Sequence, residues 1–343
     1  MVKIGVLTGG GDAPGLNAAV RAIVYKAADY GIEVIGIKRG WAGLVEADTE
    51  PLSATTVEEI TSEGGIILYT SRTNPVKMTD GIQKCMENMK KLGLDALIAI
   101  GGDDTLGVAQ KLHEAGAPVV GIPKTIDNDL STTDYSIGFH TAVSIATEAI
   151  DRLHTTAKAH RRVLIVEVMG RYTGWIALYA GIAAGAHLIL IPEIPFDLQK
   201  VYELLKKRKA EGKVYSIIVI AEGAKPTEES SLIVKSMQKD QFGHVQLGGI
   251  GQVLENLIQK ETGLETRSVV LGHLQRGGVP SAFDRFLATR LGTEAVELVK
   301  QQKWGWIPVL KGTEIVPVQF KEVVAERKVV TPELYEMAKT FFK

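Results

Sequence analysis

The chain has 343 residues, of which 45% are hydrophobic and 23% are charged, and its formal net charge is -1. This composition is typical of a globular protein, and so small a net charge indicates no general affinity for nucleic acid or anionic membranes. The single cysteine, Cys85, excludes an intramolecular disulfide and a cysteine-based metal site. The most apolar stretch, residues 176–191, is too short and interrupted to span a bilayer, so we expect a cytoplasmic protein.

Short apolar runs alternate along the chain with longer helical patterns. The runs predict strands near 2–7, 33–38, 95–100, 118–122, 162–169, 188–191, 215–220 and 267–271. The patterns between them predict helices near 16–30, 80–92, 105–115, 139–158, 173–184, 197–211, 246–261 and 281–300. A strand near 314–319 and a helix from Pro332 follow. This alternation predicts an α/β fold with a mostly parallel sheet flanked by helices.

A glycine-rich turn, Gly9-Gly10-Gly11, joins the first predicted strand to the first predicted helix. The backbone N–H groups of such a turn can approach an anion, which the start of the helix also attracts. Pro14 stands where a dinucleotide fingerprint needs glycine, and the Gly-Lys-Ser/Thr of a P-loop does not follow. The turn therefore indicates a phosphate cradle of another kind, or a tight turn that binds no ligand.

Acidic residues follow the third and fourth predicted strands. Gly101-Gly102-Asp103-Asp104 ends one strand, and residues 123–129, Pro-Lys-Thr-Ile-Asp-Asn-Asp, end the next. The carboxyl ends of neighbouring parallel strands meet at one edge of a sheet, where reacting groups gather. Carboxylates beside glycines and one lysine indicate a site for Mg²⁺ and a phosphoryl group. The alternative for Asp103 is a helix N-cap.

Asp127 and Asp129 are two residues apart, so in an extended segment their side chains point the same way. One carboxylate can then take a proton from an attacking hydroxyl while the other supports the metal. The alternative is an Asx-turn over residues 126–129. Lys124 and the neighbouring acidic strand end favour the catalytic interpretation.

Basic residues and glycines stand near other strand ends. They are Arg72, Arg162, Met169-Gly170-Arg171, Glu222-Gly223, Arg267 and His273 with Arg276. A lone arginine is usually a solvated surface charge, but several beside glycines suit an anionic ligand such as a sugar phosphate. Together with the carboxylates, this set describes phosphoryl transfer to a phosphorylated alcohol.

Six motifs in this chain resemble, in the same order, those of the 6-phosphofructokinase family. They are Gly-Gly-Asp-Ala-Pro-Gly-Leu-Asn (10–17), Gly-Gly-Asp (101–103), Thr-Ile-Asp-Asn-Asp (125–129), Val-Glu-Val-Met-Gly-Arg (166–171), Ala-Glu-Gly (221–223) and Leu-Gly-His-Leu-Gln-Arg-Gly-Gly (271–278). The resemblance covers at least residues 2–290. It implies Mg²⁺-dependent phosphorylation of the 1-hydroxyl of fructose 6-phosphate, a step of glycolysis and gluconeogenesis.

The resemblance also implies a role for each matching residue. Asp127 would be the base, Arg72 would stabilise the transferring phosphoryl group, and Asp103 and Asp129 would support Mg²⁺. The donor would contact Gly10, Gly11, Arg72, Gly102, Asp104 and Lys124. The sugar phosphate would contact Thr125, Asp127, Arg162, Met169, Gly170, Arg171, Glu222, Arg267, His273 and Arg276. In the family the residues matching Arg162 and Arg267 come from a neighbouring subunit, which implies a homodimer or homotetramer.

Two departures from the ATP-using members concern the phosphoryl donor. Those members carry glycine at the position of Asp104, and some also at that of Lys124, which leaves space for the α-phosphate of the nucleotide. Asp104 fills this space with a negative charge, and Lys124 can reach a compact leaving phosphate. This pair resembles the pyrophosphate-dependent branch, as does Trp175. The alternative is that Asp104 turns aside and ATP is the donor.

The resemblance implies a two-lobed molecule. We expect a phosphoryl-donor lobe at 1–138 plus about 250–303, and a sugar-phosphate lobe at about 139–249 plus 304–343. Tyr25, Ala54, His154 and Glu211 stand where the allosteric bacterial enzymes carry arginine. We therefore expect no regulation by nucleoside diphosphate or phosphoenolpyruvate. An inactive sugar-phosphate-binding regulator remains an alternative to an enzyme.

Overall fold

The computed structural model describes residues 2–231 and 249–343, and the chain forms two compact units. Unit 1 comprises Met1–Thr141 and Arg276–Lys328, and unit 2 comprises Ala142–Gln275 and Val329–Lys343. The first residues of the helix predicted at 246–261 lie outside the described residues, and its described part begins at Ile250.

Unit 1 contains a seven-stranded sheet in the order β11-β10-β5-β4-β1-β2-β3. Its strands are β1 (Lys3–Thr8), β2 (Glu33–Ile37), β3 (Thr49–Leu52), β4 (Ala96–Gly101), β5 (Val119–Pro123), β10 (Trp306–Lys311) and β11 (Glu314–Gln319). The five central strands are parallel, and only β3 and β11 pair antiparallel, at the two edges. The mostly parallel sheet confirms the predicted α/β class.

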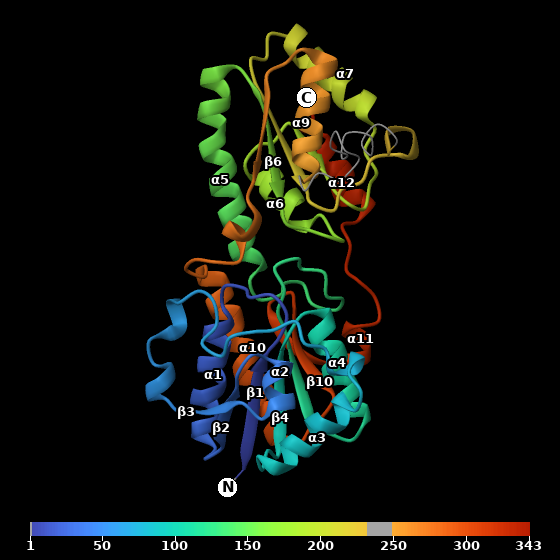
Figure 1. Ribbon diagram of the computed structural model, residues 1–343. Helices are drawn as coiled ribbons and strands as arrows, with labels where there is room; N and C mark the ends of the chain where they lie inside the picture. Colours follow the sequence, from blue (N-terminus) through green and yellow to red (C-terminus); the bar gives the residue numbers. More distant parts are fainter. Residues whose placement is uncertain (1, 232–248) are drawn as a thin grey trace. The chain divides into compact units, whose positions relative to one another are not determined.

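Helices cover both faces of this sheet (Figure 1). They are α1 (Leu16–Asp29), α2 (Trp41–Glu46), α3 (Gly81–Lys91), α4 (Asp103–Glu114), α10 (Ala282–Lys300) and α11 (Phe320–Val323). Along β4, Ile98 and Ile100 pack with α1 and α10, while Leu97 and Ala99 pack with α3 and α4. Successive side chains of a strand point to opposite faces, so burial of both faces explains the continuous apolar runs.

Unit 2 contains a four-stranded parallel sheet in the order β7-β8-β6-β9. Its strands are β6 (Val163–Val168), β7 (Leu188–Leu190), β8 (Ser216–Ala221) and β9 (Thr266–Val270). Its helices are α6 (Trp175–Ala183), α7 (Leu198–Ala210), α9 (Ile250–Thr262) and α12 (Pro332–Lys339), and the chain enters the unit within α5 (Phe139–His160). Ile165, Ile218 and Leu254 share one apolar core.

The unit boundaries differ from the predicted lobe boundaries at about 250 and 304. Residues 250–275 belong to unit 2 because β9 pairs with β6 over five residue positions. Residues 304–328 belong to unit 1 because β10 pairs with β5 and carries β11 with it. Strand pairing between distant parts of the chain decides both boundaries, and the local sequence pattern does not contain it.

Within the described residues, no helix combines the length and the apolar character needed to cross a membrane.

Candidate active site

Three turns of unit 1 meet at the carboxyl ends of neighbouring strands. Gly9-Gly10-Gly11 follows β1, Gly102 follows β4, and Lys124 follows β5, which lie side by side in the order β5-β4-β1. The chain continues from β1 to β2 on one side and returns to β4 on the other, so β1 and β4 flank a topological switch point. Ligands of open α/β sheets bind at such a point.

Lys124 lies beneath the glycine turn. Its side chain reaches back from β5, and its Nζ donates to the carbonyls of Gly9 at 3.0 Å and Gly11 at 2.5 Å. Lys124 is only 3% exposed, and burial lowers the pKa of its ammonium to about 8, with the nearby Arg276 guanidinium adding to the shift. Two of its three N–H donors are used by these carbonyls, so Lys124 shapes the turn as well as placing a charge behind it.

Arg276 packs against the same turn. Its Nη1 donates to the Asp12 carbonyl at 3.0 Å. A Cβ placed on Gly11 would lie 2.5 Å from that Nη1, so a larger residue here would require the guanidinium to shift. The turn and Arg276 therefore pack together, although 264 positions separate Arg276 from Asp12 in the sequence.

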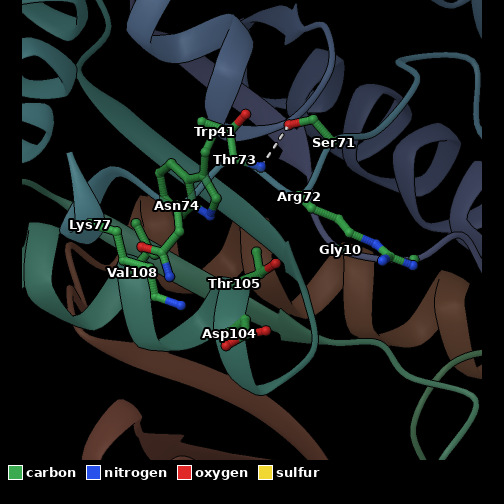
Figure 2. A pocket seen from close by; sticks show the side chains of 11 residues that line it. Gly10, Trp41, Ser71, Arg72, Thr73, Asn74, Lys77, Asp104, Thr105 and Val108 are labelled. Carbon is green, nitrogen blue, oxygen red and sulfur yellow. Dashed lines mark hydrogen bonds between the residues drawn. The ribbon is translucent and has the colours of Figure 1, made fainter. Parts of the chain in front are cut away.

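A cavity of about 310 Å³ opens beside this turn (Figure 2). Its lining includes four residues expected from the sequence to contact the donor, namely Gly10, Gly11, Arg72 and Asp104. In Figure 2 the Arg72 side chain extends toward Gly10, while Asp104 and Thr105 face the cavity from the start of α4. The helix predicted near 105–115 begins at Asp103, so Asp103 and Asp104 lie in the first turn of α4. The N-cap residue is Gly102, so the alternative of an N-cap at Asp103 is wrong.

Sequence reasoning missed several residues of this cavity. They are Trp41, Ser71, Thr73, Asn74, Lys77, Thr105 and Val108. Trp41 is 2% exposed, and its buried indole N–H has no hydrogen-bond partner within the described residues. Trp41 follows the carboxyl end of β2, and the rule that strand ends carry function would have identified it.

Asp103 and Asp129 approach a single guanidinium. Arg327 Nη2 lies 3.6 Å from Asp103 Oδ2, and Arg327 Nε lies 3.3 Å from Asp129 Oδ2. Burial raises the pKa of Asp103 and of Asp129, and the charge of Arg327 opposes both shifts. Two carboxylates suit Mg²⁺, which keeps several waters and takes its remaining ligands from phosphate. Arg327, which lies in the C-terminal tail, is not among the site residues predicted from the sequence.

Residues 125–129 turn instead of running extended as predicted. The Thr125 hydroxyl accepts from the Asp127 N–H at 3.1 Å, and Asn128 has a positive φ of 51°. Even so, Thr125, Asp127 and Asp129 are partly exposed while the residues between them are buried. Both carboxylates are thus carried by a hydroxyl-stabilised turn, which is the local hydrogen-bonding alternative to an extended chain.

In unit 2, most residues expected to hold the sugar phosphate follow the carboxyl ends of neighbouring strands. Residues 169–171 follow β6, Glu222 follows β8, and His273 lies in a short 3₁₀ helix after β9. The Met169 N–H donates to the Gln275 side chain at 3.3 Å, and Arg171, Glu222 and His273 are exposed. These polar groups line one edge of the sheet and are open to solvent. Arg276, expected with them, belongs to unit 1.

Arg162 and Arg267 lie at the opposite, amino-terminal ends of the strands of the same sheet. Arg162 precedes β6 and Arg267 is the second residue of β9, and both contact Glu265, with N···O distances of 2.8 and 3.3 Å. β6 has six residues, so its two ends are about 20 Å apart. The structure therefore does not bring these arginines together with residues 169–171 of the same chain.

The phosphofructokinase family profile matches residues 3–299. The chain is 53% identical over 341 residues to pyrophosphate–fructose 6-phosphate 1-phosphotransferase of Dictyoglomus thermophilum, covering 99% of each chain. It is 48% identical over 338 residues to ATP-dependent 6-phosphofructokinase 3 of Streptomyces coelicolor, covering 98% of this chain and 99% of the relative. Relatives named for either donor are thus similar to this chain.

A solved structure with the same fold is that of a pyrophosphate-dependent phosphofructokinase from Marinobacter aquaeolei. It superposes with a TM-score of 0.83 at 23% sequence identity, and the match covers all of this chain and 92% of that one.

Proposed function

The chain belongs to the phosphofructokinase family, and on this premise we propose that it transfers a phosphoryl group from pyrophosphate to the 1-hydroxyl of fructose 6-phosphate. The products are fructose 1,6-bisphosphate and phosphate, and the enzyme acts in the cytoplasm. A phosphoanhydride bond of the donor breaks while a phosphate ester forms on the sugar. We expect the reaction to run readily in both directions.

The carboxylate of Asp104 is the feature that favours pyrophosphate over ATP as the donor. It lines the cavity beside the glycine turn, next to Thr105 (Figure 2). A nucleotide needs room here for a third, anionic phosphate, which this carboxylate fills and repels. Pyrophosphate is shorter and avoids both penalties.

The residues of the site fit Mg²⁺. Asp103 and Asp129 offer two carboxylates within reach of one cation, as their shared contact with Arg327 indicates. When bound there, Mg²⁺ neutralises the charge of the phosphates. Asp127 holds the proton of the attacking hydroxyl, and Arg72 stabilises the charge of the transferring group. Lys124 fixes the glycine turn and places its ammonium behind the leaving phosphate.

The positions of Arg162 and Arg267 support an oligomer with shared sites. We propose that both arginines bind the 6-phosphate held by residues of a neighbouring subunit. Their separation from residues 169–171 by the length of β6 is expected if they serve another subunit's site. The assembly would be a homodimer or homotetramer.

The decisive experiment offers the purified protein fructose 6-phosphate and Mg²⁺ with either pyrophosphate or ATP. We expect turnover with pyrophosphate and little with ATP. Turnover with ATP alone would refute pyrophosphate as the donor. The absence of turnover with either donor would favour an inactive sugar-phosphate-binding protein.

A substitution tests the basis of the choice. Asp104→Gly removes the carboxylate from the cavity wall, so the ratio of kcat/KM for ATP to that for pyrophosphate should rise by about tenfold or more, which corresponds to about 1.4 kcal/mol. Asp104→Asn is the matched control, because it keeps the volume and removes the charge. An unchanged ratio in Asp104→Gly would contradict the assignment. Lys124→Gly is less informative, because it also removes the support of the glycine turn.

ATP is the second candidate donor. The cavity continues past Asp104 to Trp41 and Lys77, and the Lys77 ammonium suits a larger anionic ligand. The same donor assay decides between the two.

A further inference from the structure

The C-terminal segment of unit 1 crosses the loop that carries the catalytic carboxylates. We call residues 322–328 the C-terminal strap. The Ser131 hydroxyl contacts the carbonyls of residues 322–323 at 2.7 and 2.9 Å, and the Lys328 N–H donates to the Asp129 carbonyl at 2.9 Å. The strap backbone is therefore attached on both sides of the site by groups other than the Arg327 side chain.

The Arg327 side chain points from the strap to the two carboxylates expected to bind the metal. Its Nε and Nη2 contact the Oδ2 atoms of Asp129 and Asp103. A single delocalised cation thus bridges the two carboxylates expected to hold the metal. The guanidinium and the metal would compete for the same two side chains.

We propose that Arg327 is an internal counter-ion that competes with Mg²⁺ for Asp103 and Asp129. The inference rests on the proposed function, because it takes these carboxylates as the metal ligands. Without the metal, the single positive charge of Arg327 reduces the repulsion between the two carboxylates. Metal binding would require the guanidinium to leave them.

The surroundings permit this exchange. The Arg327 side chain is 37% exposed, so it can reach water when it leaves. A cavity of about 200 Å³, lined by the two carboxylates and residues 323–327, adjoins the contact. Because the strap backbone is attached independently, the side chain can change partners while the strap stays in place.

The test measures metal binding in the absence of both substrates, with Mn²⁺ as a spectroscopic substitute for Mg²⁺. Electron paramagnetic resonance reports the free Mn²⁺ concentration for the wild type and for Arg327→Gln. We expect the variant to bind Mn²⁺ about tenfold more tightly, because removing the competitor returns about 1.4 kcal/mol of binding free energy. Arg290→Gln is the matched control, since its guanidinium donates to the Thr313 carbonyl instead. The control should bind as the wild type does.

Equal or weaker Mn²⁺ binding by Arg327→Gln would overturn the inference. Arg327→Lys keeps a positive charge without the two-pronged guanidinium, and it serves if the glutamine variant does not fold. We expect its Mn²⁺ affinity to lie between those of the wild type and Arg327→Gln, and an affinity equal to the wild type's would contradict the role of the bridge. Donor assays on the wild type test the proposed function separately, so turnover with pyrophosphate but unchanged Mn²⁺ binding refutes the inference alone.

Discussion

Lys124 shows how a single side chain can serve both the fold and the site. Its ammonium is almost fully buried and donates to two carbonyls of the glycine turn. Burial lowers its pKa from 10.5 to about 8. The Lys124 ammonium is therefore a stronger acid in the folded protein than in the unfolded chain. At neutral pH it is charged in both states, and burying this charge opposes folding.

The pH dependence of stability follows from that shift. Below pH 8 the lysine is charged in both states, and its burial destabilises the folded state. Between pH 8 and 10.5 the folded state releases the proton and the unfolded state keeps it, so this destabilisation disappears as pH rises. The free energy of unfolding of the wild type should therefore rise, relative to that of Lys124→Met, by roughly 2–4 kcal/mol over this range.

Urea unfolding of both proteins at several pH values measures this difference. Subtracting the variant removes the contributions of other groups that titrate above pH 8. A difference in stability that does not change with pH would show that Lys124 is not buried as a charged group.

At the scale of elements, the junction of β1 and α1 depends on Gly11. Alanine there would place its Cβ 2.5 Å from Arg276 Nη1, so the guanidinium would have to move away from the turn. We expect Gly11→Ala to fold, to lose about 1 kcal/mol with the hydrogen bond to Asp12, and to raise the KM for fructose 6-phosphate several-fold. Steady-state kinetics and thermal unfolding measure the two effects.

Gly107→Ala in α4 is the control for this substitution, because no atom lies within 4 Å of the added Cβ. Alanine is the better helix former, so this variant should be stabilised by about 0.5–1 kcal/mol with unchanged kinetics. Equal kinetic constants in the two variants would show that the contact of Arg276 with the glycine turn does not affect the binding of fructose 6-phosphate.

The sequence predicted most of the elements because they are regular. All eight strands predicted up to residue 271 are present, as is the strand near 314–319. β3 and β10 were missed, and both contain a proline, Pro51 and Pro308, in a position that weakens a strand prediction. Pro308 of β10 pairs with Pro317 of β11. Neither residue has a backbone N–H, and neither is needed as a hydrogen-bond donor to the other.

At the scale of the whole molecule, the proposed sharing of sites predicts complementation. Asp127→Ala lacks the base, and Arg162→Ala lacks a residue that would serve a neighbouring subunit. In a hybrid dimer one site carries both defects, and the other has neither. Mixing equal amounts under conditions that exchange subunits should therefore restore about a quarter of wild-type activity.

Each variant alone should be nearly inactive, which provides the baseline for the mixture. Activity that stays at this baseline after verified subunit exchange would show that each site uses Arg162 of its own chain.

The sequence by itself determined the α/β class, most elements, and the residue types at the ends of the strands. These follow from local periodicity and from the chemistry that glycine, aspartate and arginine bring to a strand end. Six short motifs in order indicated the family, which the profile match over residues 3–299 confirms.

Tertiary structure alone decided which of those residues meet. It places Lys124 under a turn more than 110 positions earlier, seats Arg276 against Gly11, and brings Arg327 between Asp103 and Asp129. It also puts Arg162 and Arg267 at the amino-terminal ends of the strands, whereas residues 169–171 follow a carboxyl-terminal end. Such contacts depend on how distant strands pair and how the tail folds back, and no local pattern in the sequence contains that information.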